Sequence, residues 1–252
     1  MPADAFDSRG PAGAPTIVFL HGSSETRLQW QPQAQALSDT FHVIAADLPA
    51  HGALAGTPFR MDEVIDWLSN LVDRHAGGRA IVAGISLGGY VTMEFAARHP
   101  EQVAGAVLLS CTAEPTGPGA ALFLVATWFM SLAPLPLLRG MKHFIGRFLY
   151  SPEMAHLLTG YCFRGGAQGI RAVLWRSYIK AIRGYPGPVL FINGQRDYPF
   201  RSSERQFLAA ARQGRLEVIP RAYHVCNLDD PARVTELMRE FAQLEAAGTR
   251  NP

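Results

Sequence analysis

Short apolar runs alternate with longer amphipathic segments along most of this chain. Residues 16–20 form one such run, rich in β-branched side chains and bounded by Pro15 and Gly22, which is typical of a buried strand. Residues 61–75 show the other pattern, because their apolar positions recur on one helical face. These positions are Val64, Ile65, Leu68, Leu71 and Val72.

The alternation predicts strands and helices in turn. Strands are expected at 16–20, 41–46, 79–83, 103–109, 188–192 and 216–219. Helices are expected at 27–38, 61–75, 87–98, 203–212 and 231–247. Strands that are apolar throughout and alternate with helices form a parallel sheet covered on both faces, so the predicted fold class is α/β.

The alternation breaks once, over residues 113–184, which exceed a simple crossover and look mainly helical. We therefore predict a core domain of residues 1–112 and 185–252, with 113–184 as a helical cap. The longest apolar stretch, Ala120 to Leu138, lies in this cap and contains Pro134 and Pro136. It is interpreted as a lid helix, and stable membrane insertion is not expected.

Composition narrows the function classes. The chain has 252 residues, of which 48% are hydrophobic, which is enough for a large core. A net charge of +2 without a basic stripe gives no reason to expect nucleic acid binding. Three widely spaced cysteines suit neither a disulfide framework nor a metal site, and residues 1–15 lack a signal-peptide pattern. The expected location is therefore the cytoplasm.

The sequence Gly84-Ile85-Ser86-Leu87-Gly88 lies between a predicted strand and a predicted helix. A sharp strand-to-helix turn would hold Ser86 in strained geometry with its hydroxyl at the carboxyl edge of the sheet. Small residues on either side let the neighbouring backbone pass closely. The context predicts a nucleophile at Ser86; an ordinary glycine-rich turn is the alternative.

Acyl transfer places negative charge on the carbonyl oxygen, which needs preorganised N–H donors. One expected donor is the backbone N–H of Leu87, directly after the nucleophile. The other is expected in the loop after strand 16–20, where Ser23 is the best candidate and Ser24 the next. His21, which opens this loop, is expected to brace it.

A serine nucleophile also needs an imidazole base and a carboxylate that orients the base. His224 follows the last predicted strand and so lies at the same sheet edge as Ser86; His51 is a weaker alternative. Asp197 follows strand 188–192 and gives the chain order Ser, Asp, His; Glu114 is the fallback acid. Asp229 and Asp230, before Pro231, are interpreted as helix caps.

These motifs together resemble the α/β-hydrolase family, in its branch of esterases, enol-lactonases and carbon–carbon bond hydrolases. The matching pieces are HGSS at 21–24, DLPAHG at 47–52, GISLGG at 84–89, NGQRD at 193–197 and AYHVCNLDDP at 222–231. The resemblance implies a mostly parallel sheet, a cap inserted after the sixth family strand, a Ser–His–Asp triad, and no metal or organic cofactor. Two departures stand out: the leading hairpin is shortened to a remnant at residues 6–10, and Ala50 replaces a frequent glycine.

Substrate choice is expected to lie in the cap. Its eight basic residues face only two acidic ones, Glu114 and Glu153, which favours steering of an anionic substrate or an acyl carrier thioester, unless the charges simply solvate the surface. Ser24, Trp128, Phe129 and Trp175 are the expected substrate-binding residues.

The predicted activity is hydrolysis of a carboxylic ester, lactone or thioester of a small molecule by a monomer or homodimer. The same residues could instead run cyclisation, acyl transfer or carbon–carbon cleavage, or the chain could be a non-catalytic receptor on this scaffold. The sequence does not identify the acyl and leaving groups.

Overall fold

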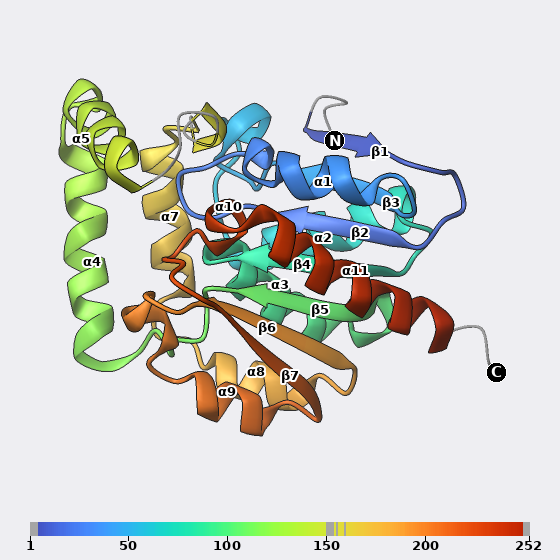
Figure 1. Cartoon of the computed structure of the whole chain (residues 1–252). Helices are drawn as coiled ribbons and strands as arrows, with labels where there is room; N and C mark the ends of the chain where they lie inside the picture. The colour runs from blue at the N-terminus through green and yellow to red at the C-terminus, as the bar shows by residue number, and fades with distance from the viewer. Residues whose placement is uncertain (1–4, 150–153, 155, 159, 249–252) are drawn as a thin grey trace.

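A seven-stranded sheet forms the centre of the computed structural model, which describes residues 5–149, 154, 156–158 and 160–248 (Figure 1). The strand order is β1-β3-β2-β4-β5-β6-β7, and every neighbouring pair is parallel except β1 with β3. The strands are β1 Phe6–Arg9, β2 Thr16–Leu20, β3 His42–Ala46, β4 Ala80–Ile85, β5 Val103–Leu109, β6 Pro188–Gly194 and β7 Gln213–Ile219. The predicted α/β-hydrolase fold is confirmed, and the hairpin remnant is the antiparallel edge strand β1.

Helices cover both faces of this sheet, as Figure 1 shows. They are α1 Gln31–Leu37, α2 Met61–His75, α3 Leu87–Arg98, α8 Tyr178–Gly184, α9 Glu204–Ala210, α10 Cys226–Asp229 and α11 Pro231–Gly248. Successive strand residues point to opposite faces. In β2, Ile17 and Phe19 pack with α1 and α11, whereas Val18 and Leu20 pack with α2 and α3.

Several predicted elements have different bounds in the structure. The segment predicted as helix 27–38 is a 3₁₀ turn, η1 Arg27–Trp30, followed by α1, because Pro32 cannot donate a backbone hydrogen bond and is tolerated only in the first turn. Strands β6 and β7 are both longer than predicted, and they pair from Pro188 with Gln213 to Gly194 with Ile219.

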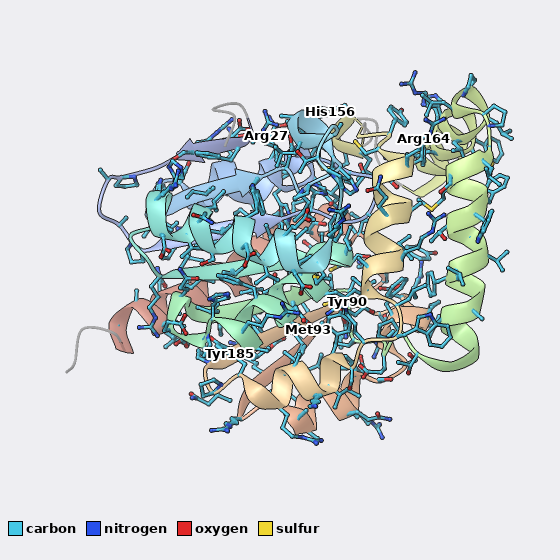
Figure 2. All side chains as sticks on the ribbon, turned by 180° about the vertical axis from the view of Figure 1, so that it is seen from behind. Arg27, Tyr90, Met93, His156, Arg164 and Tyr185 are labelled. Carbon is cyan, nitrogen blue, oxygen red and sulfur yellow. The ribbon has the colours of Figure 1, made fainter. Side chains whose placement is uncertain are left out.

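The cap begins after β5 with α4 Gly117–Leu132 and α5 Leu135–Leu149, followed by η4 His156–Leu158 and α7 Phe163–Val173. In both views α4 stands at the edge of the molecule, with α7 between it and the sheet (Figures 1 and 2). The next helix, α8, packs instead against α3 and α9, and its Tyr178 and Ile182 lie in the main core. The last helix within the predicted cap range 113–184, α8, therefore packs in the core layer.

Among the described residues, no single helix is long and apolar enough to cross a membrane. Two consecutive helical segments, Gly119–Leu132 and Leu135–Phe144, are long and apolar enough to cross a membrane only when they are taken together, and they are bent by 119° relative to each other.

Candidate active site

Ser86 occupies the sharp turn between β4 and α3. Its φ of 52° and ψ of −114° are strained for a residue with a side chain. The turn is fixed by a hydrogen bond from the Ser86 amide to the Leu109 carbonyl, 2.9 Å long. A Cβ on Gly84 would lie 2.2 Å from the Gly88 oxygen, and one on Gly88 would lie 2.2 Å from the Leu20 oxygen. Only glycine at both positions therefore lets the turn close under Ser86.

The structure brings Ser86, His224 and Asp197 together. His224 Nε2 lies 3.0 Å from Ser86 Oγ, and His224 Nδ1 lies 2.9 Å from Asp197 Oδ2. A carboxylate only accepts, so Nδ1–H donates to Asp197 and Nε2 is left to accept the serine proton. Asp197 is 5% exposed, and the ring centroids of Phe200 and His224 lie 4.1 Å apart. The His224 ring is therefore held by Asp197 on one side and by Phe200 on another.

Two neighbouring strand ends supply the base and the acid. Asp197 closes the turn after β6 by donating its amide to the Gly194 carbonyl at 3.1 Å. The loop after β7 carries His224 and is tied to that turn by the Arg196 amide, which donates to the Ala222 carbonyl at 2.8 Å. Because β6 and β7 are parallel neighbours, both loops leave the same sheet edge as Ser86.

The carboxylates interpreted as helix caps have separate roles. Asp230 accepts from the Arg233 amide at 3.1 Å and caps α11 as predicted. Asp229 instead accepts from the Tyr223 amide at 2.6 Å, so it braces the loop that carries His224. Sequence spacing could not separate the two, because the difference depends on how the loop folds back.

The predicted oxyanion donors lie beside Ser86. Gly22 donates its amide to Gln29 Oε1 at 2.8 Å, and a Cβ placed on Gly22 would lie 3.7 Å from the Ser86 Cβ. Within the described part of the chain, no acceptor takes the backbone N–H of Ser23 or Leu87. Ser24, the second candidate, already donates its amide to His51 Nε2 at 3.3 Å. The geometry thus favours Ser23 and Leu87 as the pair that meets developing negative charge.

Two buried histidines hold the loop of residues 21–24, which contains Ser23. His21 Nδ1 donates to the Gly22 carbonyl, and its Nε2 accepts the Leu48 amide at 3.0 Å. His51 Nδ1 donates to the Pro49 carbonyl and its Nε2 accepts from Ser24, so it does not serve Ser86. Burial lowers the pKa of both imidazoles, and the neutral rings brace the loop, as predicted for His21.

A cavity of about 590 Å³ opens over Ser86 and His224 between the sheet edge and the cap. Ser24 and Phe129, two of the residues predicted to bind substrate, line it. The predictions for Trp128 and Trp175 are wrong, because neither lines the cavity and they are 60% and 58% exposed. Trp128 precedes Phe129 on α4, and neighbouring helix residues point about 100° apart, so the half-exposed Phe129 ring reaches the cavity while the Trp128 ring does not.

The sequence does not indicate a buried ion pair that lies at the cavity wall. Lys142 Nζ on α5 lies 2.6 Å from Glu25 Oε1, in the loop that follows Ser24, and 4.9 Å from the Tyr161 ring centroid. Burial raises the pKa of the Glu25 carboxyl, and the Lys142 charge partly opposes that rise. No periodicity connects positions 25 and 142, so only the folded chain could reveal this link between core and cap.

Glu114, the fallback acid, has another role. Its Oε2 accepts hydrogen bonds from the amides of Tyr178 and Ile179 at 3.1 and 3.2 Å, which satisfies the N-terminus of α8.

In the part of the chain that the structure describes, no group of three or more His, Cys, Asp or Glu side chains is arranged to hold a metal ion.

Comparison with known proteins adds independent information. The model of the alpha/beta hydrolase family matches residues 17–237. The chain is 27% identical to 3-oxoadipate enol-lactonase 2 of Acinetobacter baylyi over 232 residues, covering 88% of this chain and 86% of that protein. It is 36% identical to Lipase LipV of Mycobacterium tuberculosis over 101 residues, which is 40% of this chain and 38% of that protein. A malate-bound thermophilic esterase from Thermogutta terrifontis superimposes with a TM-score of 0.81 at 25% identity, covering 96% of this chain and 93% of the other.

Proposed function

Because the chain belongs to the α/β hydrolase family, we propose that it is a serine hydrolase that cleaves a carboxylic ester, lactone or thioester through an acyl-enzyme at Ser86. The observation that carries the proposal is the continuous pair of hydrogen bonds from Ser86 to His224 and from His224 to Asp197, at 3.0 and 2.9 Å. They sit at the wall of a cavity large enough for a small organic substrate.

In the proposed reaction, Ser86 Oγ attacks the substrate carbonyl while His224 Nε2 takes the hydroxyl proton. Asp197 holds the imidazole in the required tautomer and stabilises its positive form. The negative charge that develops on the carbonyl oxygen is met by the amides of Ser23 and Leu87, with the N-terminus of α3 behind them.

The same groups complete acylation and then hydrolyse the acyl-enzyme. His224 passes its proton to the departing alcohol or thiol, which leaves the acyl group bound as an ester to Ser86. A water molecule then enters, gives a proton to Nε2 and attacks the acyl carbonyl. Collapse of this intermediate returns the proton to Ser86 and releases the carboxylic acid.

The cavity favours an apolar, uncharged acyl group. Phe123, Phe129, Met130, Leu138, Ile170 and Val173 contribute apolar side chains to its wall. Lys142 also lines it, but its charge is already paired with Glu25 at 2.6 Å. A substrate carboxylate at this point would have to compete with Glu25, so we favour a neutral apolar acyl group over the anionic substrate that the charge of the cap suggests.

The test is turnover of p-nitrophenyl esters and acyl thioesters of increasing chain length. We expect wild-type turnover, and a loss in kcat on the order of 10⁴-fold or more for Ser86→Ala. Asp197→Asn is the matched control for orientation. It keeps the size of the side chain but cannot favour the correct tautomer of His224, and should lose on the order of 10³–10⁴-fold.

A fluorophosphonate probe separates the ways in which this experiment can fail. Labelling of Ser86 without turnover of any ester or thioester would mean a competent nucleophile that serves a non-hydrolytic or carbon–carbon cleaving reaction. If the folded wild-type protein shows no labelling and no turnover, the proposal is contradicted. The chain would then be a binding protein on the same scaffold.

A further inference from the structure

The cap helix α4 has its apolar side turned to solvent. Val125, Trp128, Phe129 and Leu132 are spaced as one helical face, and they are 65%, 60%, 47% and 72% exposed. An α-helix on the surface of a water-soluble domain normally turns this kind of stripe toward the core. On α4 an apolar stripe faces solvent instead.

The side of α4 that faces inward carries two hydroxyl groups beside apolar residues of the cavity wall. Thr127 is fully buried against α7, where Arg171 Nε donates to its Oγ1 at 3.0 Å. Arg171 also donates to the Thr127 carbonyl at 3.1 Å and to Ser131 Oγ at 2.9 Å. These three charge-assisted hydrogen bonds fix the rotation of α4, so the outward position of Trp128 and Leu132 is built into the packing.

The exposed apolar surface continues onto α5. Leu135, Leu137, Met141 and Phe144 are 42%, 50%, 43% and 63% exposed. We define the outer cap face as the exposed apolar residues of both helices, namely Val125, Trp128, Phe129, Leu132, Leu135, Leu137, Met141 and Phe144. Single exposed apolar residues are ordinary, but eight of them on two consecutive helices indicate an interaction surface.

Charge indicates what this face meets. Residues 115–152 contain Arg139, Lys142 and Arg147 and no Asp or Glu, and the charge of Lys142 is already paired with Glu25. Arg139 is exposed on α5, and Arg164 lies at the end of α7 nearest α5, as Figure 2 shows. An apolar helical surface with Trp, flanked by cations and free of acids, is the composition of a segment that lies in the interface of an anionic bilayer.

The position of the cavity suggests why the outer cap face would contact a bilayer. Phe129 and Met141 both belong to the outer cap face and line the cavity over Ser86. Two apolar side chains of the cap surface therefore also contact the cavity that contains the candidate nucleophile. An apolar ester dissolved in a membrane could enter the cavity beside them without crossing water.

We propose that the outer cap face docks on an anionic lipid bilayer, placing the mouth of the cavity at the membrane surface. Docking needs no active nucleophile, although its use in taking up an apolar ester rests on the proposed function. The contact is peripheral: the apolar side chains of α4 and α5 enter the headgroup region while the sheet stays in water.

The experiment is co-sedimentation of Ser86→Ala protein with vesicles, which separates docking from catalysis. We expect binding to equimolar phosphatidylglycerol and phosphatidylcholine vesicles, and much weaker binding to phosphatidylcholine alone. The double variant Trp128→Ser, Leu132→Ser should bind the anionic vesicles about tenfold more weakly or worse. Arg139→Gln should lose about fivefold, and added salt should narrow that difference.

Leu244→Ser is the matched control, because Leu244 is 65% exposed on α11, outside the cap. It should bind like the parent protein. In the wild-type background, turnover of a short soluble ester should be equal for the double variant and the control, since neither Trp128 nor Leu132 lines the cavity. Equal turnover also shows that both variants fold.

Tryptophan fluorescence gives a second measurement. Anionic vesicles should shift the emission of the parent protein to shorter wavelength, and the double variant should lose the shift because Trp128 is the ring that enters lipid. Two results would overturn the proposal. One is absence of binding to anionic vesicles. The other is that light scattering shows a dimer for the parent protein and a monomer for the double variant, and neither protein binds vesicles. That result would assign the outer cap face to a second copy of the chain.

Discussion

The central sheet and the cap helix α4 use apolar residues in opposite ways. In β5, residues Ala106 to Leu109 are at most 1% exposed, and both faces of the strand are covered by helices. On α4, Leu132 is 72% exposed while the hydroxyl of Thr127 is buried against Arg171. The comparison teaches that apolar composition alone does not say which side of a helix is covered, because the neighbouring helix decides that.

The strongest test of this contrast removes one leucine from each region. Leu108→Ala in β5 should lower the free energy of unfolding by about 2–5 kcal/mol, because a fully buried side chain leaves a cavity. Leu132→Ala should change it by no more than about 0.5 kcal/mol. Chemical denaturation followed by circular dichroism measures both. A loss of more than 2 kcal/mol for Leu132→Ala would mean that α4 is covered in solution.

A smaller effect concerns the contact between cap and core. A Cβ on Gly165 of α7 would lie 2.0 Å from the Ala50 oxygen, so Gly165→Ala must push α7 away from the loop that follows β3. We expect a loss of about 1–3 kcal/mol in stability, with reduced turnover because the cavity wall moves.

Gly140→Ala on α5 is the matched substitution, since nothing lies within 4 Å of its added Cβ. It should be neutral or stabilise α5 by up to about 1 kcal/mol, because alanine is the better helix former. Thermal unfolding and ester turnover of the two variants, measured side by side, check the prediction. Equal behaviour of the pair would argue against a close fit between α7 and the core.

The smallest expected effect is a pH dependence that belongs to the core. Burial lowers the pKa of His21, so the unfolded state binds more protons than the folded state as the pH falls through the ordinary histidine range. Stability should therefore fall with decreasing pH. One imidazole that stays neutral in the folded state contributes about 1.4 kcal/mol of this loss between pH 7.5 and 5.5.

Comparison with His21→Gln isolates this contribution from other groups. The raised pKa of Glu25 has the opposite sign, because its protonated form is favoured by folding, and it is present in both proteins. Denaturation midpoints at both pH values should show a shallower pH dependence for the variant. Parallel pH dependences would mean that folding does not change the pKa of His21.

The sequence by itself determined the sheet and the loops at its carboxyl edge. Short apolar runs and helical periodicity are local patterns, and they place Ser86, Asp197 and His224 after three strands of the sheet, β4, β6 and β7. Parallel strands end at one edge, so the convergence of these three residues followed from topology. The buried loop histidine His21 could also be predicted, since it stands where a strand leaves the core.

Only the tertiary structure decided the cap. Residues 117–132 are apolar almost all round, so no periodicity could tell whether Trp128 or Phe129 faces the cavity; the hydrogen bonds from Arg171 settle it. The pairing of Glu25 with Lys142 joins positions far apart in the chain. Local patterns record which side chains avoid water, but contacts between distant segments fix their direction, because a helix can rotate about its axis until a partner holds it.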